Sequence, residues 1–265
     1  MKMHIISCGK LWLEKSALLA GEAADGYERV YIPVPVFLFD HPEGLVLFDT
    51  ACDPEGMSKN WPEMNKQVSP LFAGANEHLP AQLRQLGISP DDIKYVVMSH
   101  LHTDHAGCLK LFKKAEVFVS ELELMEALKQ LALRVYKPAY IESDIRGWLG
   151  AELNWRLIVP GIKEYSLLPG LTIVNFGSGH TYGMMGLLAE FRKSCSFLLV
   201  ADALYTKENL GPPVMLAGLV HDEQGYIRTA NFIREYAAAH NATILFGHDA
   251  AQFDSLIKSD EGYYE

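Results

Sequence analysis

The chain has 265 residues, and its content of 49% hydrophobic and 21% charged residues is typical of a globular protein and excludes a disordered one. A formal net charge of −10 argues against binding to nucleic acid and against docking on an anionic membrane. No apolar stretch is long enough to cross a membrane, so we expect no membrane insertion. The length suits one domain, which we predict to span residues 1–265.

The cysteines point to a reducing compartment. Cys8, Cys52, Cys108 and Cys195 lie far apart in the sequence and form no CxxC pair. This spacing fits neither a disulfide framework nor a zinc–thiolate site. The apolar run near the first residue is also too short for a signal peptide. We therefore expect free thiols in a cytoplasmic protein.

In the first half of the chain, apolar and β-branched runs alternate with irregular stretches. Two strands, the first with two prolines that favour an edge position or an irregular start, flank a turn at residues 40–44. Gly, Pro and Asn recur over residues 53–77, which predicts a long loop. The predicted strands are residues 31–39, 45–48, 93–98 and 116–119, and the predicted helices are residues 79–86 and 120–133.

The second half begins with an ambiguous segment, residues 134–165, and continues with short apolar strands. An amphipathic helix is predicted over residues 225–240. The predicted strands are residues 171–176, 185–191, 197–200 and 243–246. Strands outnumber helices, and the helices fall between groups of strands. This α/β (α+β) pattern favours two sheets packed together with helices outside them.

A dense group of metal-ligand side chains directly follows the strand predicted at residues 93–98. In Ser99-His100-Leu101-His102-Thr103-Asp104-His105, the side chains of His100 and His102 point the same way if the chain is still extended there. A turn after Thr103 would bring Asp104 and His105 to the same space. Imidazole and carboxylate ligands together suit zinc, iron or manganese.

Three further ligand-type residues each follow a predicted strand. They are His180, Asp202 and His248, and small residues or glycines lie beside each of them. The ligands of the loop at residues 100–105 are too crowded for a single ion, and two ions would need more ligands. The sequence therefore predicts a site for two metal ions where the strand ends meet.

The order HxHxDH, His, Asp and His resembles that of the metallo-β-lactamase-fold hydrolases. Within this superfamily, the stretch DALYTKEN from Asp202 to Asn209 resembles the N-acyl-homoserine lactone lactonases. The segments Phe246-Gly247-His248-Asp249 and Leu47-Phe48-Asp49-Thr50 are also similar. The resemblance spans roughly residues 30 to 255 and implies a four-layer αββα sandwich with the metals at one edge.

The resemblance also implies a role for each residue. One ion would be held by His100, His102 and His180, the second by Asp104, His105 and His248, with Asp202 bridging the two. Asp49 would accept the second N–H of a ligand imidazole. The ions would be zinc first, with iron, manganese and cobalt as alternatives.

The implied reaction is the opening of the lactone ring of an N-acyl-homoserine lactone by a hydroxide shared between two metals. Tyr205 would donate a hydrogen bond to the oxyanion, and Asp104 would pass a proton to the leaving alkoxide. The implied partner is a small-molecule lactone. For the assembly, we expect a monomer or a homodimer.

Two positions depart from the family pattern. Met184 stands where relatives often have a second histidine, which affects local packing but not metal binding. Thr103 stands where relatives often have phenylalanine, so one apolar wall beside the metals is missing. We expect broad selectivity among acyl chains, resting on apolar residues of the segments 11–20 and 61–72.

Other functions remain open on the sequence. The main alternative is another ester or thioester hydrolase of the same fold, such as a glyoxalase II-like enzyme, although that type needs basic residues for glutathione and a further helical domain. A β-lactamase usually has a cysteine where Asp202 stands. A nuclease would want a basic surface, and a flavodiiron protein would need an acidic residue at His102. A metal-binding module without catalysis also remains.

Overall fold

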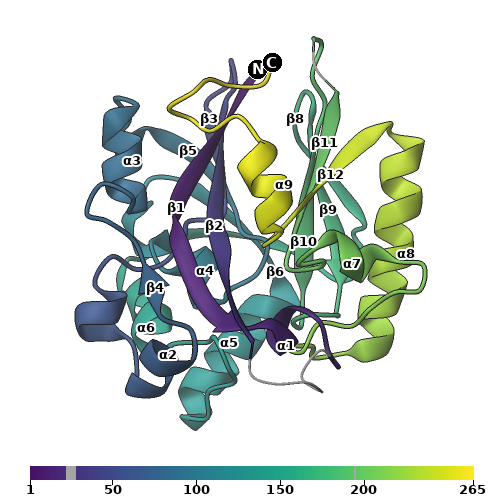
Figure 1. Cartoon of the computed structure of the whole chain (residues 1–265). Helices are drawn as coiled ribbons and strands as arrows, with labels where there is room; N and C mark the ends of the chain where they lie inside the picture. The colour runs from purple at the N-terminus through teal and green to yellow at the C-terminus, as the bar shows by residue number, and fades with distance from the viewer. Residues whose placement is uncertain (22–27, 194) are drawn as a thin grey trace.

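A computed structural model describes residues 1–21, 28–193 and 195–265, which form two β-sheets with helices around them (Figure 1). The first sheet has the strand order β4-β1-β2-β3-β5-β6-β7, and the second has the order β12-β11-β10-β9-β8. The strands are β1 (Lys2–Glu14), β2 (Arg29–Asp40), β3 (Leu45–Phe48), β4 (Leu71–Phe72), β5 (Ile93–Val97), β6 (Glu116–Ser120), β7 (Asn154–Ile158), β8 (Glu164–Leu168), β9 (Leu171–Gly177), β10 (Met184–Ala189), β11 (Ser196–Ala201) and β12 (Ala242–Phe246).

Each sheet combines antiparallel and parallel pairs. In the first sheet, β4, β1, β2 and β3 are antiparallel neighbours, whereas β3, β5, β6 and β7 run parallel. In the second sheet only β11 and β12 are parallel. Parallel neighbours end at the same edge of a sheet, so the loops after β3 and β5, and those after β11 and β12, leave from shared edges.

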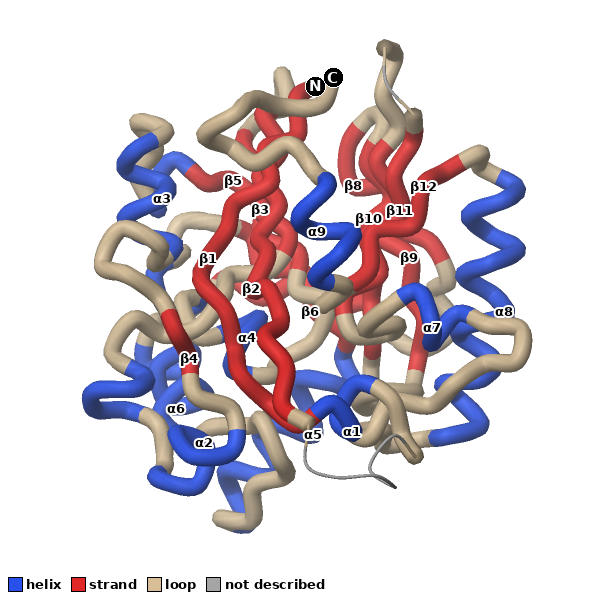
Figure 2. The backbone as a smooth tube through the Cα atoms, viewed as in Figure 1, coloured by secondary structure: helices blue, strands red, loops and turns tan. Residues whose placement is uncertain are grey.

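Most of the helices lie outside the pair of sheets, which gives the expected αββα arrangement, whereas α9 lies between the two sheets in the view of Figure 2 and its Phe253 packs with residues of both. The long helix α8 (Glu223–Ala239) contacts β9 and β12 of the second sheet, and α5 (Glu121–Leu133) contacts β6 of the first. The other helices are α1 (Lys15–Leu18), α2 (Glu63–Val68), α3 (Leu79–Gln85), α4 (Thr103–Ala106), α6 (Glu142–Gly150), α7 (Lys207–Leu210) and α9 (Ala250–Ser255), with single turns at Gly56–Asn60, Pro90–Asp92 and Leu109–Leu111. Among the described residues, no helix combines the length and apolar character needed to cross a membrane.

Alternation along the strands builds two separate apolar layers. Phe37 and Phe39 of β2 pack in a cluster between the sheets together with Leu187 of β10 and Leu199 of β11. Their strand neighbours, such as Leu38, point to the opposite face and pack under the helices. Strands of this kind are buried on both faces, which explains why they read as continuous apolar runs in the sequence.

Most predicted elements are present within two residues of their expected limits, including the helix at residues 120–133 and the strand at residues 45–48. The loop predicted at residues 53–77 is partly wrong, since it contains α2 and β4. The ambiguous segment 134–165 holds α6, β7 and the start of β8. The strand β1 was not predicted at all.

Candidate metal centre

The predicted ligands lie in loops that leave the ends of strands from both sheets. His100 follows β5, and His180 follows β9. Asp202 comes directly after β11, and His248 follows β12. The backbone N–H of Met185 in β10 donates to the carbonyl of Ser99 at 2.8 Å, which joins the two sheets at this edge.

The HxHxDH segment changes from extended chain to helix within the motif. His102 has extended backbone angles and caps α4, whose first turn carries Asp104 and His105. The turn lies tightly against the loop after β3, because Thr50 donates through both its backbone N–H and its hydroxyl to the carbonyl of His105. Gly107 completes the fit, since a Cβ there would lie 2.1 Å from the backbone nitrogen of Asp53. This geometry places His100 and His102 in one ligand group and Asp104 and His105 in the neighbouring one.

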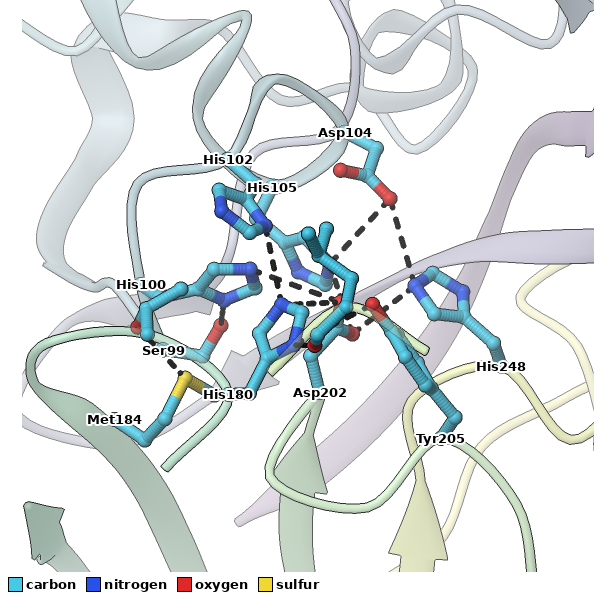
Figure 3. A network of polar contacts seen from close by, with 12 residues as sticks. Ser99, His100, His102, Asp104, His105, His180, Met184, Asp202, Tyr205 and His248 are labelled. Carbon is cyan, nitrogen blue, oxygen red and sulfur yellow. Dashed lines mark hydrogen bonds and ion pairs between the residues drawn. The ribbon is translucent and has the colours of Figure 1, made fainter. Parts of the chain in front are cut away.

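The structure brings all seven predicted ligand residues together as two buried groups (Figure 3). Within each group, the candidate ligand atoms lie within 4.8 Å of one another. The first group contains His100, His102, His180 and Asp202, and the second contains Asp104, His105 and His248.

Asp202 faces both groups through different oxygens. Its Oδ2 lies 3.3 Å from Nε2 of His180 and 3.7 Å from Nε2 of His100. Its Oδ1 lies 3.1 Å from Nε2 of His105 and 3.0 Å from Nε2 of His248. Asp104 completes the second group, with Oδ2 at 3.4 Å from Nε2 of His248. This is the arrangement that a carboxylate shared by two cations requires.

A second set of contacts, made to the Nδ1 atoms, orients four of the imidazoles. Oδ2 of Asp49 lies 2.8 Å from Nδ1 of His105 and also accepts the hydroxyl of Ser99, which is 2.9 Å from Nδ1 of His100. The Nδ1 atoms of His180 and His248 instead contact the backbone carbonyls of Leu219 and Pro33. Contacts of this kind fix the ring orientation and leave each Nε2 free to bind a metal.

Burial and mutual charge set opposite pKa shifts in the two groups. Burial lowers the pKa values of His100 and His102, and neighbouring imidazoles lower them further. Burial also opposes the charge of His248, but Asp202 and Asp104 outweigh it and raise the pKa of His248 to about 10. The pKa of Asp202 is held well below its usual range because His248 and His105 overcome the effect of burial. Asp202 and Asp104 thus stabilise positive charge on the neighbouring groups at this site.

The residues fit divalent metal ions. Nε2 of His100 is buried inside the cluster and has no hydrogen-bond partner among the described residues. A buried polar atom without a partner is costly, and a metal ion would satisfy it. Imidazole and carboxylate donors in two groups that share one carboxylate form a dimetal type of site.

Tyr205 lines a cavity of about 580 Å³ together with four of the candidate ligands, His102, Asp104, Asp202 and His248. Its ring contacts those of His180 and His248, with centroids at 5.1 and 5.3 Å. The segments 11–20 and 61–72 contribute apolar residues to the lining of this cavity, among them Leu11, Leu13, Leu18, Pro62, Met64 and Val68. The two segments named in the sequence prediction therefore line the same cavity.

Sequence reasoning missed several residues that contact this centre. The hydroxyl of Thr103 donates to Oδ2 of Asp144 at 2.6 Å, and Asp144 is almost fully buried. Glu123 and Tyr140 contact the loops that carry the histidines. All three lie on helices or loops of ordinary composition, so no local pattern could have marked them. Met184, the other departure, accepts the hydroxyl of Thr181 through its sulfur and lies in β10.

Two sheets between helices, with His and Asp ligands at one edge, define a metal-dependent hydrolase of the metallo-β-lactamase type. The sequence pattern of the metallo-beta-lactamase superfamily matches residues 31–248. This match covers most of the chain, and the chain belongs to this superfamily.

Relatives place the chain more narrowly, within the family of the N-acyl homoserine lactonases. The chain is 41% identical to N-acyl homoserine lactonase AiiB of Agrobacterium fabrum over 100% of its own length and 99% of the relative. It is 29% identical to an N-acyl homoserine lactonase of Bacillus thuringiensis, over 95% of its own length and 94% of the relative. A solved N-acyl homoserine lactone hydrolase, with N-hexanoyl-L-homoserine at its catalytic metal centre, matches with a TM-score of 0.85 and 27% identity, over 99% and 98%.

Proposed function

We propose that this protein opens the lactone ring of N-acyl homoserine lactones by metal-dependent hydrolysis. The proposal rests above all on Asp202, whose two oxygens face two separate groups of ligands. It is supported by relatives named as lactonases, which the chain matches over nearly their full length. The apolar cavity above the ligands offers a place for an acyl chain.

In this proposal, His100, His102 and His180 hold one ion, Asp104, His105 and His248 hold the second, and Asp202 contacts both. The preferred ion is zinc, with iron, manganese and cobalt as alternatives that the same donors accept. When bound, such ions supply a hydroxide nucleophile at neutral pH and a Lewis acid for the lactone carbonyl.

The protein's own groups supply hydrogen bonding and proton transfer. Burial and the nearby charge of Asp202 raise the pKa of Tyr205 well above its usual range, so its hydroxyl stays protonated. The hydroxyl can therefore donate to the oxyanion that develops on the lactone carbonyl. Asp104 is a carboxylate of the second ligand group and also lines the cavity. Asp104 is then ready to take up a proton and deliver it to the leaving alkoxide.

Acyl-chain selectivity is expected to be broad. The hydroxyl of Thr103 is engaged by Asp144, so at this position the cavity has neither an aromatic wall nor a free polar donor. The contacts left for an acyl chain include aliphatic side chains of β1 and α2, together with Ile32, Ala139 and Leu219. Loss of one apolar contact costs only about 1–3 kcal/mol of discrimination, so chains of several lengths should be accepted.

The experiment that tests this function compares kcat/KM for a long-chain N-acyl homoserine lactone, a glutathione thioester and a β-lactam, assayed by proton release. We expect the lactone to be preferred by at least tenfold. A tenfold preference for the thioester would instead favour a glyoxalase II-like hydrolase, and a preference for the β-lactam would favour a lactamase. Metal analysis of the same preparation should find two ions per chain.

We further propose that residues 1–265 form one domain, in a cytoplasmic monomer or homodimer that does not bind nucleic acid. The apolar cluster between the sheets joins both halves of the chain. Cys8, Cys52 and Cys108 are buried free thiols, as expected for a reducing compartment. Cell fractionation and the mass of the purified protein in solution test the location and the assembly.

A further inference from the structure

Glu123 is a carboxylate buried beside the metal centre without belonging to either group of ligands. It lies in the first turn of α5, directly after β6, and its exposed fraction is 0%. Burial raises the pKa of Glu123, whereas its hydrogen bonds act in the opposite direction. An acidic side chain in such a place is costly unless donors satisfy it.

The donors that satisfy Glu123 come from the loops that carry metal ligands. Oε1 accepts the backbone N–H of Leu101 at 3.0 Å, and Leu101 stands between His100 and His102. Oε2 accepts the backbone N–H of Gly183 at 3.2 Å, in the loop that carries His180. One carboxylate therefore joins the loop of the first sheet to the loop of the second.

The close approach at Gly183 shows how tightly these parts fit. A Cβ at this glycine would lie 2.7 Å from Cβ of Ser120 and 3.1 Å from the backbone nitrogen of Glu123. Neither neighbouring atom can move without moving β6 or α5. The loop of His180 is therefore held against the start of α5 by contact as well as by the hydrogen bond.

Tyr140 extends the same network to the substrate side. Its hydroxyl donates to Oε1 of Glu123 at 2.5 Å, and its ring meets that of His102 edge-on with centroids 4.7 Å apart. Tyr140 lines the apolar cavity and also a second cavity of about 290 Å³ that reaches His180 and His221. The tyrosine is thus a wall between two cavities, and Glu123 fixes its position.

We infer that Glu123 is a positioning residue, which holds the His100–His102 turn, the His180 loop and the ring of Tyr140 in the arrangement needed to bind metal. The inference rests on the metal centre of the proposed function. Glu123 touches neither the candidate ligand atoms nor the reacting atoms. Its effect is exerted through its hydrogen bonds to the two loops and to Tyr140, whose ring contacts His102.

Three variants test this role. Glu123→Gln keeps the shape but turns an amide N–H₂ toward at least one of the present donors. Tyr140→Phe keeps the negative charge and the ring but removes one hydrogen bond. Glu121→Gln removes a charge from the same helical turn and is the matched control, since its side chain makes no hydrogen bond or ion pair among the described residues.

The measurements are zinc retention against a chelator, the absorption spectrum of the cobalt-substituted protein and, for wild type and Tyr140→Phe, kcat and KM for a lactone. Loss of a residue that orients metal ligands typically weakens metal binding by about 10–100-fold. We expect Glu123→Gln to lose zinc about 10–100-fold more readily and to change the cobalt spectrum, with Glu121→Gln within about twofold of wild type. Tyr140→Phe should change the spectrum in the same direction and raise KM more than it lowers kcat.

A folded Glu123→Gln protein with wild-type zinc retention and an unchanged cobalt spectrum would overturn the inference. An equal loss of zinc in Glu121→Gln would also overturn it, because charge alone would then explain the effect. If Glu123→Gln does not fold, Tyr140→Phe decides, and an unchanged spectrum there counts against the role. Zinc retention and the cobalt spectrum need no substrate, so failure of the lactonase proposal would be seen separately, in the wild-type assay.

Discussion

At the scale of single residues, Asp202 differs from the other ligand-type side chains because it alone faces both groups. Gly247 makes this position possible, since a Cβ there would lie 2.8 Å from Oδ1 of Asp202. Ala201, the residue before Asp202, has a φ of 45°, which is an unfavourable value for any residue other than glycine. Strain and close contact are thus concentrated where two positive ions would share one carboxylate.

Replacement of this carboxylate should remove the metals. In Asp202→Ala, two cations would face each other without a shared negative charge, and their repulsion in a buried site is strong. We expect metal content to fall below one ion per chain and lactone hydrolysis to be lost. Tyr205→Phe is the contrasting variant, expected to keep two ions while kcat falls by about 10²–10³. Wild-type metal binding in Asp202→Ala would show that Asp202 bridges nothing.

Asp144 is a second residue whose chemistry follows from its surroundings. Burial raises its pKa to about 7, whereas the hydrogen bond from Thr103 lowers it. Oδ1 of Asp144 has no hydrogen-bond partner among the described residues. The folded protein therefore holds this proton more tightly than the unfolded chain, whose carboxyl has a pKa near 3.8.

The sign of the resulting pH effect is fixed by this difference. The neutral form of Asp144 makes its full contribution to the free energy of unfolding below pH 3.8. This contribution is lost as the pH rises from 3.8 to about 7, because the unfolded chain loses the proton first. Asp144→Asn stays neutral and can still accept the Thr103 hydroxyl. We expect its free energy of unfolding, relative to wild type, to be about 2.6 kcal/mol more favourable at pH 8 than at pH 5. Urea titrations at both pH values measure this, and a difference independent of pH would contradict it.

At the scale of elements, the strands with continuous apolar runs were predictable because both of their faces are buried. The strand β1 was missed since charged residues interrupt its pattern and its register shifts between Ser7 and Lys10. The prolines of β2 suggested an edge position or an irregular start, and the register of β1 with β2 shifts between the pairs Ser7–Pro35 and Lys10–Pro33, although β2 as a whole lies between β1 and β3. Pro33 and Pro35 are tolerated because β3 pairs only with Phe37, Leu38 and Phe39, farther along the strand.

The candidate site was predictable to the extent that ligands follow strand ends in the sequence. His180, Asp202 and His248 stand alone in their loops, yet each directly follows an apolar run. Glu123 and Asp144 lie within helices, and their partners are distant in sequence. No periodicity records such contacts, so only the folded chain reveals them.

Residues of α2 that line the cavity provide a test of whether the acyl chain binds there. Met64 and Val68 line the cavity, whereas Gln67 is absent from the cavity wall that the described residues form. We expect Val68→Asp to lower kcat/KM for a long-chain lactone by about tenfold, because a charge replaces an apolar contact, and to leave a short-chain lactone within about twofold. Gln67→Asp is the matched control. Equal losses for both chain lengths would place the acyl chain elsewhere.

At the scale of the whole molecule, one apolar cluster contains residues of both sheets, and the metal centre joins their edges. We therefore expect one cooperative thermal transition rather than two. Metal at about 100 times its dissociation constant contributes about 2.7 kcal/mol. Its removal should then lower Tm by about 5–10 °C in a chain of this length. Calorimetry with and without chelator measures both quantities, and two separate transitions would argue against a single domain.

The most direct test of the central claim is to add zinc stepwise to the metal-free protein and follow lactone opening by proton release. The account predicts that activity on an N-acyl homoserine lactone rises with bound metal and reaches its plateau at two ions per chain. A plateau at one ion would contradict the shared carboxylate of Asp202. If no lactone is hydrolysed at any metal content, the proposed function is wrong.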